Sequence, residues 1–255
     1  MTALSKSLLA AIFLAASLPA AEPTLYLIGD STVCNQSLIP AQPLRGWGQM
    51  LPLYLKDDIK VQNHAKSGES SRSFMINKRW QTVLGQLKQG DFLLIQFGHN
   101  DPKPDEKRHT EPRGEYRDNL LRYIREAREH GATPVLATPP CRRVFDKDGS
   151  LRDTHGDYPV AMREVAAEQK VPLLDLEKRT RELLLQLGPD RSKALFASFE
   201  PDEFAAVPQG RQDGTHFNAY GASRICDLAV DEMQKTSPEL AAHLRTGVLE
   251  PPAGR

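Results

Sequence analysis

The sequence predicts a three-layer α/β/α domain built around a five-stranded parallel sheet. Short apolar segments alternate along the chain with longer amphipathic segments, which is typical of repeated strand–helix–strand units. The apolar segments are apolar at consecutive positions, most clearly over residues 92–97, as expected for strands buried on both faces. The 255 residues are 40% hydrophobic and 26% charged, which suffices for one substantial core.

Individual elements follow from apolar periodicity and from glycine or proline at the boundaries. Strands are expected over 25–28, 60–63, 92–97, 134–138 and 171–176. Helices are expected over 47–55, 80–87, 116–128, 160–169, from 177 to about 187, and over 219–233. Two long polar loops, 102–113 and 141–157, remain, and loops of that length are commonly functional or disordered.

The first 21 residues differ from the rest and are predicted to be a secretory signal peptide. Lys6 gives a positive start, residues 8–16 are apolar, and a small-residue segment with Pro19 follows. A first core helix is the alternative reading, but Pro19 and the polar Glu22 count against it. We expect cleavage near Ala20 or Ala21, a single mature domain over 22–255, and a secreted or periplasmic location. No later segment resembles a membrane span, so no membrane contact is expected of the mature form.

Charge and cysteine content exclude several function classes. Lys plus Arg and Asp plus Glu both number 33, so bulk charge favours neither a nucleic-acid partner nor an anionic membrane. Cys34, Cys141 and Cys226 show no C-x-x-C spacing, which gives no support for a zinc or redox site. Small buried apolar side chains are the expected role of the three thiols, and whether two of them pair stays open.

Four polar clusters carry the candidate chemistry. Residues 29–32, 67–70 and 98–101 each follow a predicted strand, and residues 213–216 precede the last predicted helix. Because the carboxyl ends of parallel strands meet at one edge of the sheet, the first three clusters should lie together. The fourth cluster would have to join them, which spacing alone cannot prove.

The residue types in these clusters fit acyl transfer. Ser31 is a candidate nucleophile, and a serine hydroxyl needs a base such as His216 to take its proton. Asp213, three residues earlier, can orient and stabilise the imidazole. The backbone N–H groups of Ser31 and Gly68 and the amide of Asn100 could donate to an oxyanion. Each cluster alone has an ordinary reading as a turn or a helix cap, whereas four in this order form a joint signal.

The chain resembles the SGNH (GDSL-type) hydrolases, whose four blocks are named for Ser, Gly, Asn and His. The matching positions are Ser31, Gly68, Asn100 and His216, and the resemblance spans about residues 24–235. It implies a flavodoxin-like fold, Asp213 as the acid of the triad, and catalysis without a metal or other cofactor.

Finer features resemble the rhamnogalacturonan acetylesterase branch of these hydrolases. They are Thr32 in the first block, the run Arg-Gly-Trp-Gly at 45–48, and the run Asp-Gly-Thr-His-Phe at 213–217. The resemblance implies a secreted serine esterase that removes O-acetyl groups from an acetylated plant cell-wall polysaccharide or oligosaccharide. Pectin rhamnogalacturonan is the expected substrate, and acetylated xylan oligomers are the alternative.

Two aromatic residues beside these blocks are candidates for substrate contact. His99 could shape the acetyl pocket, and Trp47 could stack on a sugar ring. The structural alternatives are that His99 caps or packs and that Trp47 is core at a helix start. The predicted rim segments 66–79, 102–113 and 141–157 carry twelve Lys or Arg and eight acids, a small excess that suits an anionic ligand.

Two other readings of the same residues remain. A metal-dependent phosphoesterase could use Asp30, His99, Asn100, Asp101 and His216 as ligands, but the His-Asn order is reversed from the usual one and H-E-x-x-H is absent. A carbohydrate-binding protein without activity is the non-enzymatic reading, disfavoured because every catalytic position is filled. A lipase of the α/β-hydrolase type is disfavoured because no G-x-S-x-G elbow occurs.

Overall fold

The structure is a computed structural model that describes residues 22–38 and 43–249. The predicted signal peptide, residues 1–21, lies outside the described residues. Among the residues that are described, no helix combines the length and the apolar character that crossing a membrane requires.

A five-stranded parallel sheet forms the centre of the molecule, as predicted. Its strands are β1 (Thr24–Gly29), β3 (Lys60–Asn63), β4 (Phe92–Gln96), β5 (Thr133–Ala137) and β6 (Leu173–Leu174). They lie in the order β3-β1-β4-β5-β6, every pair parallel. This is a doubly wound order whose direction reverses between β1 and β4, the position at which such sheets bind ligands beyond the strand ends.

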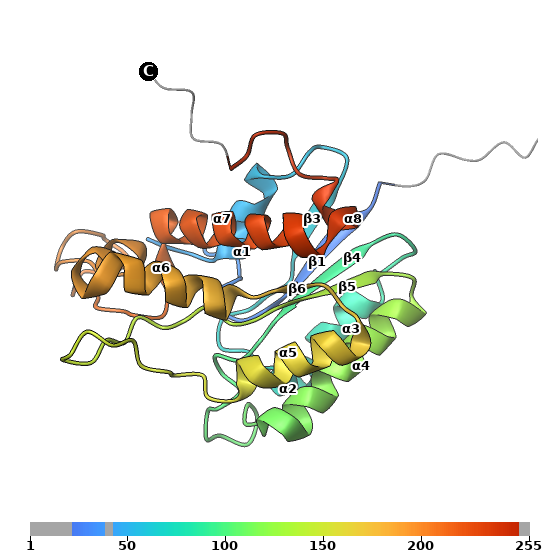
Figure 1. The fold of residues 1–255 in the computed structure, drawn as a ribbon, viewed down its shortest axis with the longest axis horizontal. Coiled ribbons are helices and arrows are strands. Elements are labelled where there is room, and N and C mark those ends of the chain that lie inside the picture. The colour runs from blue at the N-terminus through green and yellow to red at the C-terminus, as the bar shows by residue number, and fades with distance from the viewer. Residues whose placement is uncertain (1–21, 39–42, 250–255) are drawn as a thin grey trace, which may run out of the picture.

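Helices cover both faces of the sheet (Figure 1). One face carries α1 (Trp47–Met50), α6 (Leu176–Arg191), α7 (Ala219–Thr236) and α8 (Pro238–Ala241). The other carries α2 (Ser71–Ile76), α3 (Arg79–Leu84), α4 (Arg117–Glu129) and α5 (Tyr158–Gln169). Side chains of β1 alternate between the two cores, with Leu25 and Leu27 on one side and Tyr26 and Ile28 on the other.

Several elements are shorter than the sequence predicted. The helix expected over 47–55 is four residues of α1 followed by a 3-10 turn, η1 (Leu51–Leu53), with a proline in its first turn. The strand expected over 171–176 shortens to two residues because Asp175 already caps α6. Helix α2, which a capping box of Ser70 and Ser73 begins, has only six residues and gave no periodic signal.

A second, two-stranded sheet was not predicted. Antiparallel β2 (Leu44–Arg45) and β7 (Phe217–Asn218) join distant parts of the chain through two residue pairs. Because β7 intervenes, Asp213 and His216 do not lie at the first turn of α7, which begins at Ala219. Two short turns complete the elements, η2 (Pro112–Tyr116) and η3 (Ser192–Leu195).

All three cysteines are buried and unpaired, which agrees with their expected role as small apolar side chains.

Candidate active site

Ser31 lies in a tight turn directly after β1, at the carboxyl end of the sheet. The backbone carbonyl of Asp30 accepts from Val33 N (3.3 Å) and Cys34 N (3.1 Å), and its carboxylate accepts from Thr32 N (2.9 Å) and Thr32 Oγ1 (2.8 Å). Burial alone would raise the pKa of Asp30, but neighbouring His99 and the bonds from Thr32 lower it. An ionised, fully buried Asp30 therefore fixes the turn that presents the partly exposed Ser31.

Three side chains form a continuous hydrogen-bonded chain. Ser31 Oγ lies 2.9 Å from His216 Nε2, and His216 Nδ1 lies 2.7 Å from Asp213 Oδ2. These separations are those of a nucleophile, its base and the orienting acid. The side chains of His216 and Asp213 are 28% and 13% exposed, so an ester can reach Ser31 while Asp213 stays sheltered.

Asp213 is held in one orientation by its own loop. Its Oδ1 accepts from the backbone N–H groups of Thr215 (2.7 Å) and His216 (3.0 Å). Its Oδ2 accepts from Arg211 Nε (2.9 Å) and Arg211 Nη2 (2.5 Å) as well as facing the imidazole. Burial tends to raise the pKa of Asp213, but these hydrogen bonds, first among them the one from His216, hold it far below its ordinary value.

Tertiary contacts bring the fourth cluster to the rim. Arg143 N donates to Gly214 O (2.6 Å), and a Cβ on Gly214 would lie 2.5 Å from Arg143 O, so only glycine permits this approach. The guanidinium of Arg142 donates to Thr215 Oγ1 (3.0 Å) and to His99 O (2.8 Å). Arg142 therefore links the third cluster to the fourth.

Donors suited to an oxyanion lie on the loops after β1, β3 and β4. Within residues 22–38 and 43–249, the backbone N–H groups of Ser31 and Gly68 donate to no protein acceptor. Asn100 Nδ2 donates one hydrogen to Glu69 O (2.9 Å), and its second has no acceptor among those same residues. Lys66 N donates to the carbonyl of Gly29 (3.0 Å), which ties the loops of the first two clusters together. Gly68 is exposed, has a φ of +84° and has no atom within 4 Å of a built Cβ, so a substrate can approach its backbone.

Asp101 completes the loop after β4 as a buried anchor. Its carboxylate accepts from Ser71 N (3.0 Å), Ser71 Oγ (2.5 Å) and Gly98 N (3.0 Å). Burial raises the pKa of Asp101 to about 7, although the bonds from Ser71 and Thr110 act in the opposite direction. The side chain holds the start of α2 against the turn that contains Asn100.

The structure contradicts both predicted substrate contacts. Trp47 is fully buried and its Nε1 donates to Gln96 Oε1 (2.8 Å), so it belongs to the core and cannot stack on a sugar. His99 is 2% exposed, and its two ring nitrogens lie 3.1 Å from Asp30 Oδ2 and 3.1 Å from Pro140 O. Because both ring nitrogens have protein partners, His99 stabilises the turn of Ser31 from its buried side and does not reach the substrate.

Three residues near the site were missed by sequence reasoning. Arg211 touches Asp213 and lies 3.3 Å from His216 Nδ1, and Arg142 links two clusters. His155 packs edge-on against His99 with ring centroids 4.7 Å apart, and burial drives its pKa well below 6.5. Only Arg142 could have been identified from the sequence, because it follows the strand at 133–137 and so lies near the edge of the sheet where the clusters meet. Nothing in the local sequence identifies Arg211 or His155 as a residue of the site.

The candidate metal ligands do not gather at one point. Asp30 and His99 contact each other inside the core, whereas His216 faces Ser31. Over the described ranges, no group of three or more His, Cys, Asp or Glu side chains is placed to hold a metal ion. The arrangement at the rim is instead that of a nucleophile, a base and an open set of N–H donors.

A family model described as GDSL-like lipase/acylhydrolase matches residues 27–224. A rhamnogalacturonan acetylesterase of Bacillus subtilis is 40% identical over 220 residues, which cover 86% of this chain and 93% of that protein. A rhamnogalacturonan acetylesterase of Emericella nidulans is 38% identical, with 80% of this chain and 82% of that protein covered.

Solved structures share the fold. The crystal structure of the B. subtilis protein YxiM matches with a TM-score of 0.71 at 30% identity, over 85% of this chain and 57% of that one. An acetylxylan esterase of Geobacillus stearothermophilus matches with a TM-score of 0.60 at 19% identity, over 84% of this chain and 94% of that one. These likenesses agree with the doubly wound sheet.

Proposed function

Since the chain belongs to the GDSL-like lipase/acylhydrolase family and is a carboxylic ester hydrolase, we propose that it removes O-acetyl groups from rhamnogalacturonan with Ser31 as nucleophile. The observation that carries the proposal is the hydrogen-bonded chain from Ser31 Oγ through His216 to Asp213. The named activity of the relatives that match most of this chain supports the substrate.

In the proposed first half-reaction, Ser31 Oγ attacks the acetyl carbonyl carbon while His216 Nε2 takes the hydroxyl proton. The carbonyl oxygen becomes an oxyanion that accepts from the N–H groups of Ser31 and Gly68 and from the amide of Asn100. When the bond between the acetyl carbon and the sugar oxygen breaks, His216 returns the proton to that oxygen. The sugar leaves with a free hydroxyl group and Ser31 carries the acetyl group.

In the second half-reaction, water takes the place of the sugar hydroxyl. His216 removes a proton from the water, which attacks the acetyl carbon through the same oxyanion. When the intermediate collapses, the bond between Ser31 Oγ and the acetyl carbon breaks, His216 returns its proton to Oγ, and acetic acid leaves and ionises to acetate. Asp213 stays ionised throughout, because its pKa lies far below its ordinary value, and stabilises the imidazolium formed in each half.

Export belongs to the same proposal. A pectin substrate lies outside the cell, which suits a secreted or periplasmic enzyme and a signal peptide over residues 1–21. Amino-terminal sequencing of the mature protein tests this part, and a mature chain that retains residues 1–21 would contradict it.

Acetate release from acetylated rhamnogalacturonan, acetylated xylan and an aryl acetate tests the activity. We expect the highest kcat/KM on rhamnogalacturonan, and a loss of about 10³-fold or more on every ester in Ser31→Ala. Ser150→Ala, which removes a hydroxyl from an exposed loop, is the matched control and should keep the wild-type rate. Full activity of purified Ser31→Ala would refute the serine mechanism. Equal rates on acetylated rhamnogalacturonan and acetylated xylan would refute the assignment of rhamnogalacturonan as the substrate.

A further inference from the structure

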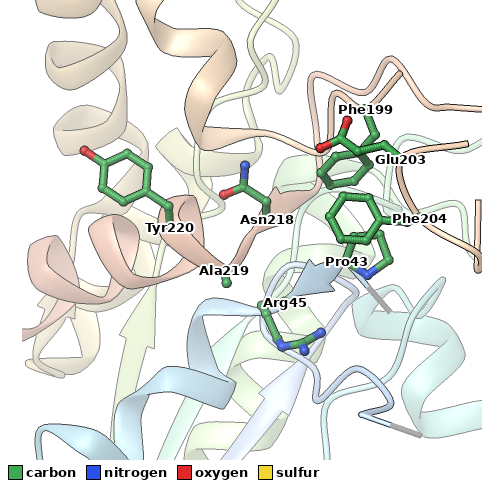
Figure 2. Close-up of a pocket in the computed structure, with 8 residues that line it drawn as sticks. All are labelled: Pro43, Arg45, Phe199, Glu203, Phe204, Asn218, Ala219 and Tyr220. Atoms are coloured by element: carbon green, nitrogen blue, oxygen red, sulfur yellow. The ribbon is translucent and has the colours of Figure 1, made fainter. Parts of the chain in front are cut away.

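A pocket of about 430 Å³ lies beside the candidate triad and has no role in the chemistry described so far. Figure 2 shows the rings of Phe199 and Phe204 lying together next to Pro43, with Arg45 on β2 and Asn218 on β7 bordering the same space. The centroids of the two phenylalanine rings are 4.7 Å apart, and their planes meet edge to face. The remaining lining residues are Glu203, Ala219 and Tyr220.

The walls of this pocket connect directly to the triad. Arg45 pairs with Phe217, the residue that follows His216, and Asn218 is two residues from His216, a Cα separation of at most about 7 Å. On the other wall, Phe199 and Arg211 exchange two backbone hydrogen bonds of 2.8 and 2.9 Å, and Arg211 contacts Asp213. The pocket therefore lies on the His216 side of Ser31.

The proposed reaction decides which part of an ester occupies that side. The acetyl oxygen must face the donors of Ser31, Gly68 and Asn100, whereas the leaving oxygen must lie near His216 Nε2 to receive its proton. A pocket beside His216 is therefore reached by the leaving alcohol, which is the sugar, and by the sugar units attached to it. The acyl group of the ester would extend away from this pocket.

The lining selects an uncharged sugar with an apolar face. Aromatic rings and proline offer flat apolar surface, and the pocket holds one cation, Arg45, and one anion, Glu203, so its charge balances. The side-chain amide of Asn218 is committed to the carbonyls of Ala194 and Phe196 and to Gly221 N, which leaves it no free polar atom for a ligand. A uronate would gain little here, whereas a C6 methyl group would bury apolar area.

We propose that this pocket is a subsite for a neutral 6-deoxyhexose unit that neighbours the acetylated sugar. The inference rests on the proposed function, because rhamnogalacturonan supplies a 6-deoxyhexose beside each uronic acid. Packing of the methyl-bearing face on Phe204 then distinguishes this polymer from a xylan, whose pentose units carry no methyl group.

Saturation-transfer NMR on the wild-type protein tests the subsite directly. The probe is a deacetylated rhamnogalacturonan oligosaccharide, so the result does not depend on acetyl release. We expect the C6 methyl protons of the deoxyhexose to receive the strongest saturation. Saturation confined to the uronate ring protons, or absent from the methyl group, would overturn the proposal.

Inhibition of aryl acetate hydrolysis by the same oligosaccharide gives the second test. Phe204→Leu keeps the apolar bulk but removes the ring, so the inhibition constant should rise roughly tenfold, whereas Phe204→Trp should preserve it. Phe145→Leu, which removes a similarly half-buried ring outside the pocket, is the matched control, and its inhibition constant for the oligosaccharide should equal that of the wild type. An unchanged inhibition constant in Phe204→Leu would overturn the subsite.

Two comparisons separate the possible failures. If Phe204→Leu changes the preference among aryl acetate, butyrate and hexanoate but leaves oligosaccharide inhibition unchanged, the pocket holds an acyl chain and the proposal is wrong. If a xylo-oligosaccharide inhibits as well as the methyl-bearing one, the deoxyhexose assignment is wrong. Failure of the wild type to deacetylate rhamnogalacturonan would instead refute the proposed function, since neither test measures that reaction.

Discussion

Replacing Asp213 by Asn tests the triad through the geometry of one loop. The backbone N–H groups of Thr215 and His216 both point at Oδ1, so the asparagine must place its carbonyl oxygen there. Its NH₂ group then faces His216 Nδ1 and the guanidinium of Arg211 in place of Oδ2. A donor facing His216 Nδ1 forces the tautomer that carries its proton on Nε2, and that nitrogen can no longer accept the proton of Ser31.

The expected loss in kcat is about 10⁴-fold, or roughly 5 kcal/mol of transition-state stabilisation. Burst and steady-state kinetics on an aryl acetate measure it, because acylation of Ser31 should slow while KM changes little. Asp190→Asn, which makes the same exchange at an exposed position, is the control and should match the wild type. An Asp213→Asn enzyme within tenfold of the wild-type kcat would refute the assignment of Asp213.

The same variant has a stability signature with a definite sign. The pKa of Asp213 is depressed in the folded protein, so its contribution to stability is present above about pH 4 and is lost as the pH falls through the folded value. Melting temperatures should therefore fall less steeply in acid for Asp213→Asn than for the wild type. Parallel curves would show that the native hydrogen bonds to Asp213 are absent in solution.

Three further predictions concern the surrounding residues and metals. Asn100→Ala should lower kcat about 10²–10³-fold with little change in KM, whereas Asn77→Ala, which removes a bond to the Glu69 carboxylate, should not; a pure KM effect would place Asn100 in substrate binding. His99→Ala should cost about 2–5 kcal/mol in the free energy of unfolding, because it removes one hydrogen-bond partner of buried Asp30 and leaves a cavity under the turn of Ser31, and denaturant titration showing under 1 kcal/mol would contradict this. Prolonged chelation should leave the rate of acetate release unchanged, and an enzyme inactivated by chelator and restored by a divalent cation would favour the metal-ligand reading.

Elements that depend on patterns of a few neighbouring residues could be predicted from the sequence. Four of the five parallel strands were predicted from apolar runs, whereas β3 has the mixed sequence Lys-Val-Gln-Asn. Parallel strand ends meet at one edge of the sheet, so the clusters of Ser31, Gly68 and Asn100 could be placed together. Long helices such as α4 and α7 were predicted to within a few residues because their apolar faces repeat. Elements of two to six residues, such as α2 and β7, are too short to carry a period.

Burial of aromatic side chains was decided by the tertiary structure. Trp47 lies in the run 45–48 and His99 in the polar cluster 98–101, yet packing against the sheet buries both side chains below the site. Phe199 and Phe204, unremarkable in sequence, line the pocket beside His216. Sequence neighbours share a loop, but whether a side chain faces solvent depends on segments that arrive from far along the chain.

The sequence by itself determined the chemistry that this protein has available: a serine, a histidine, an aspartate and the N–H donors, on a sheet whose strand ends converge. Only the tertiary structure decided that they meet, because Ser31 and His216 are 185 residues apart and no local pattern constrains their separation. The distance of 2.9 Å between Ser31 Oγ and His216 Nε2 depends on the contacts of Arg142, Arg143 and Arg45 with the loop of His216. Such long-range hydrogen bonds form between surfaces that exist only after the chain has folded.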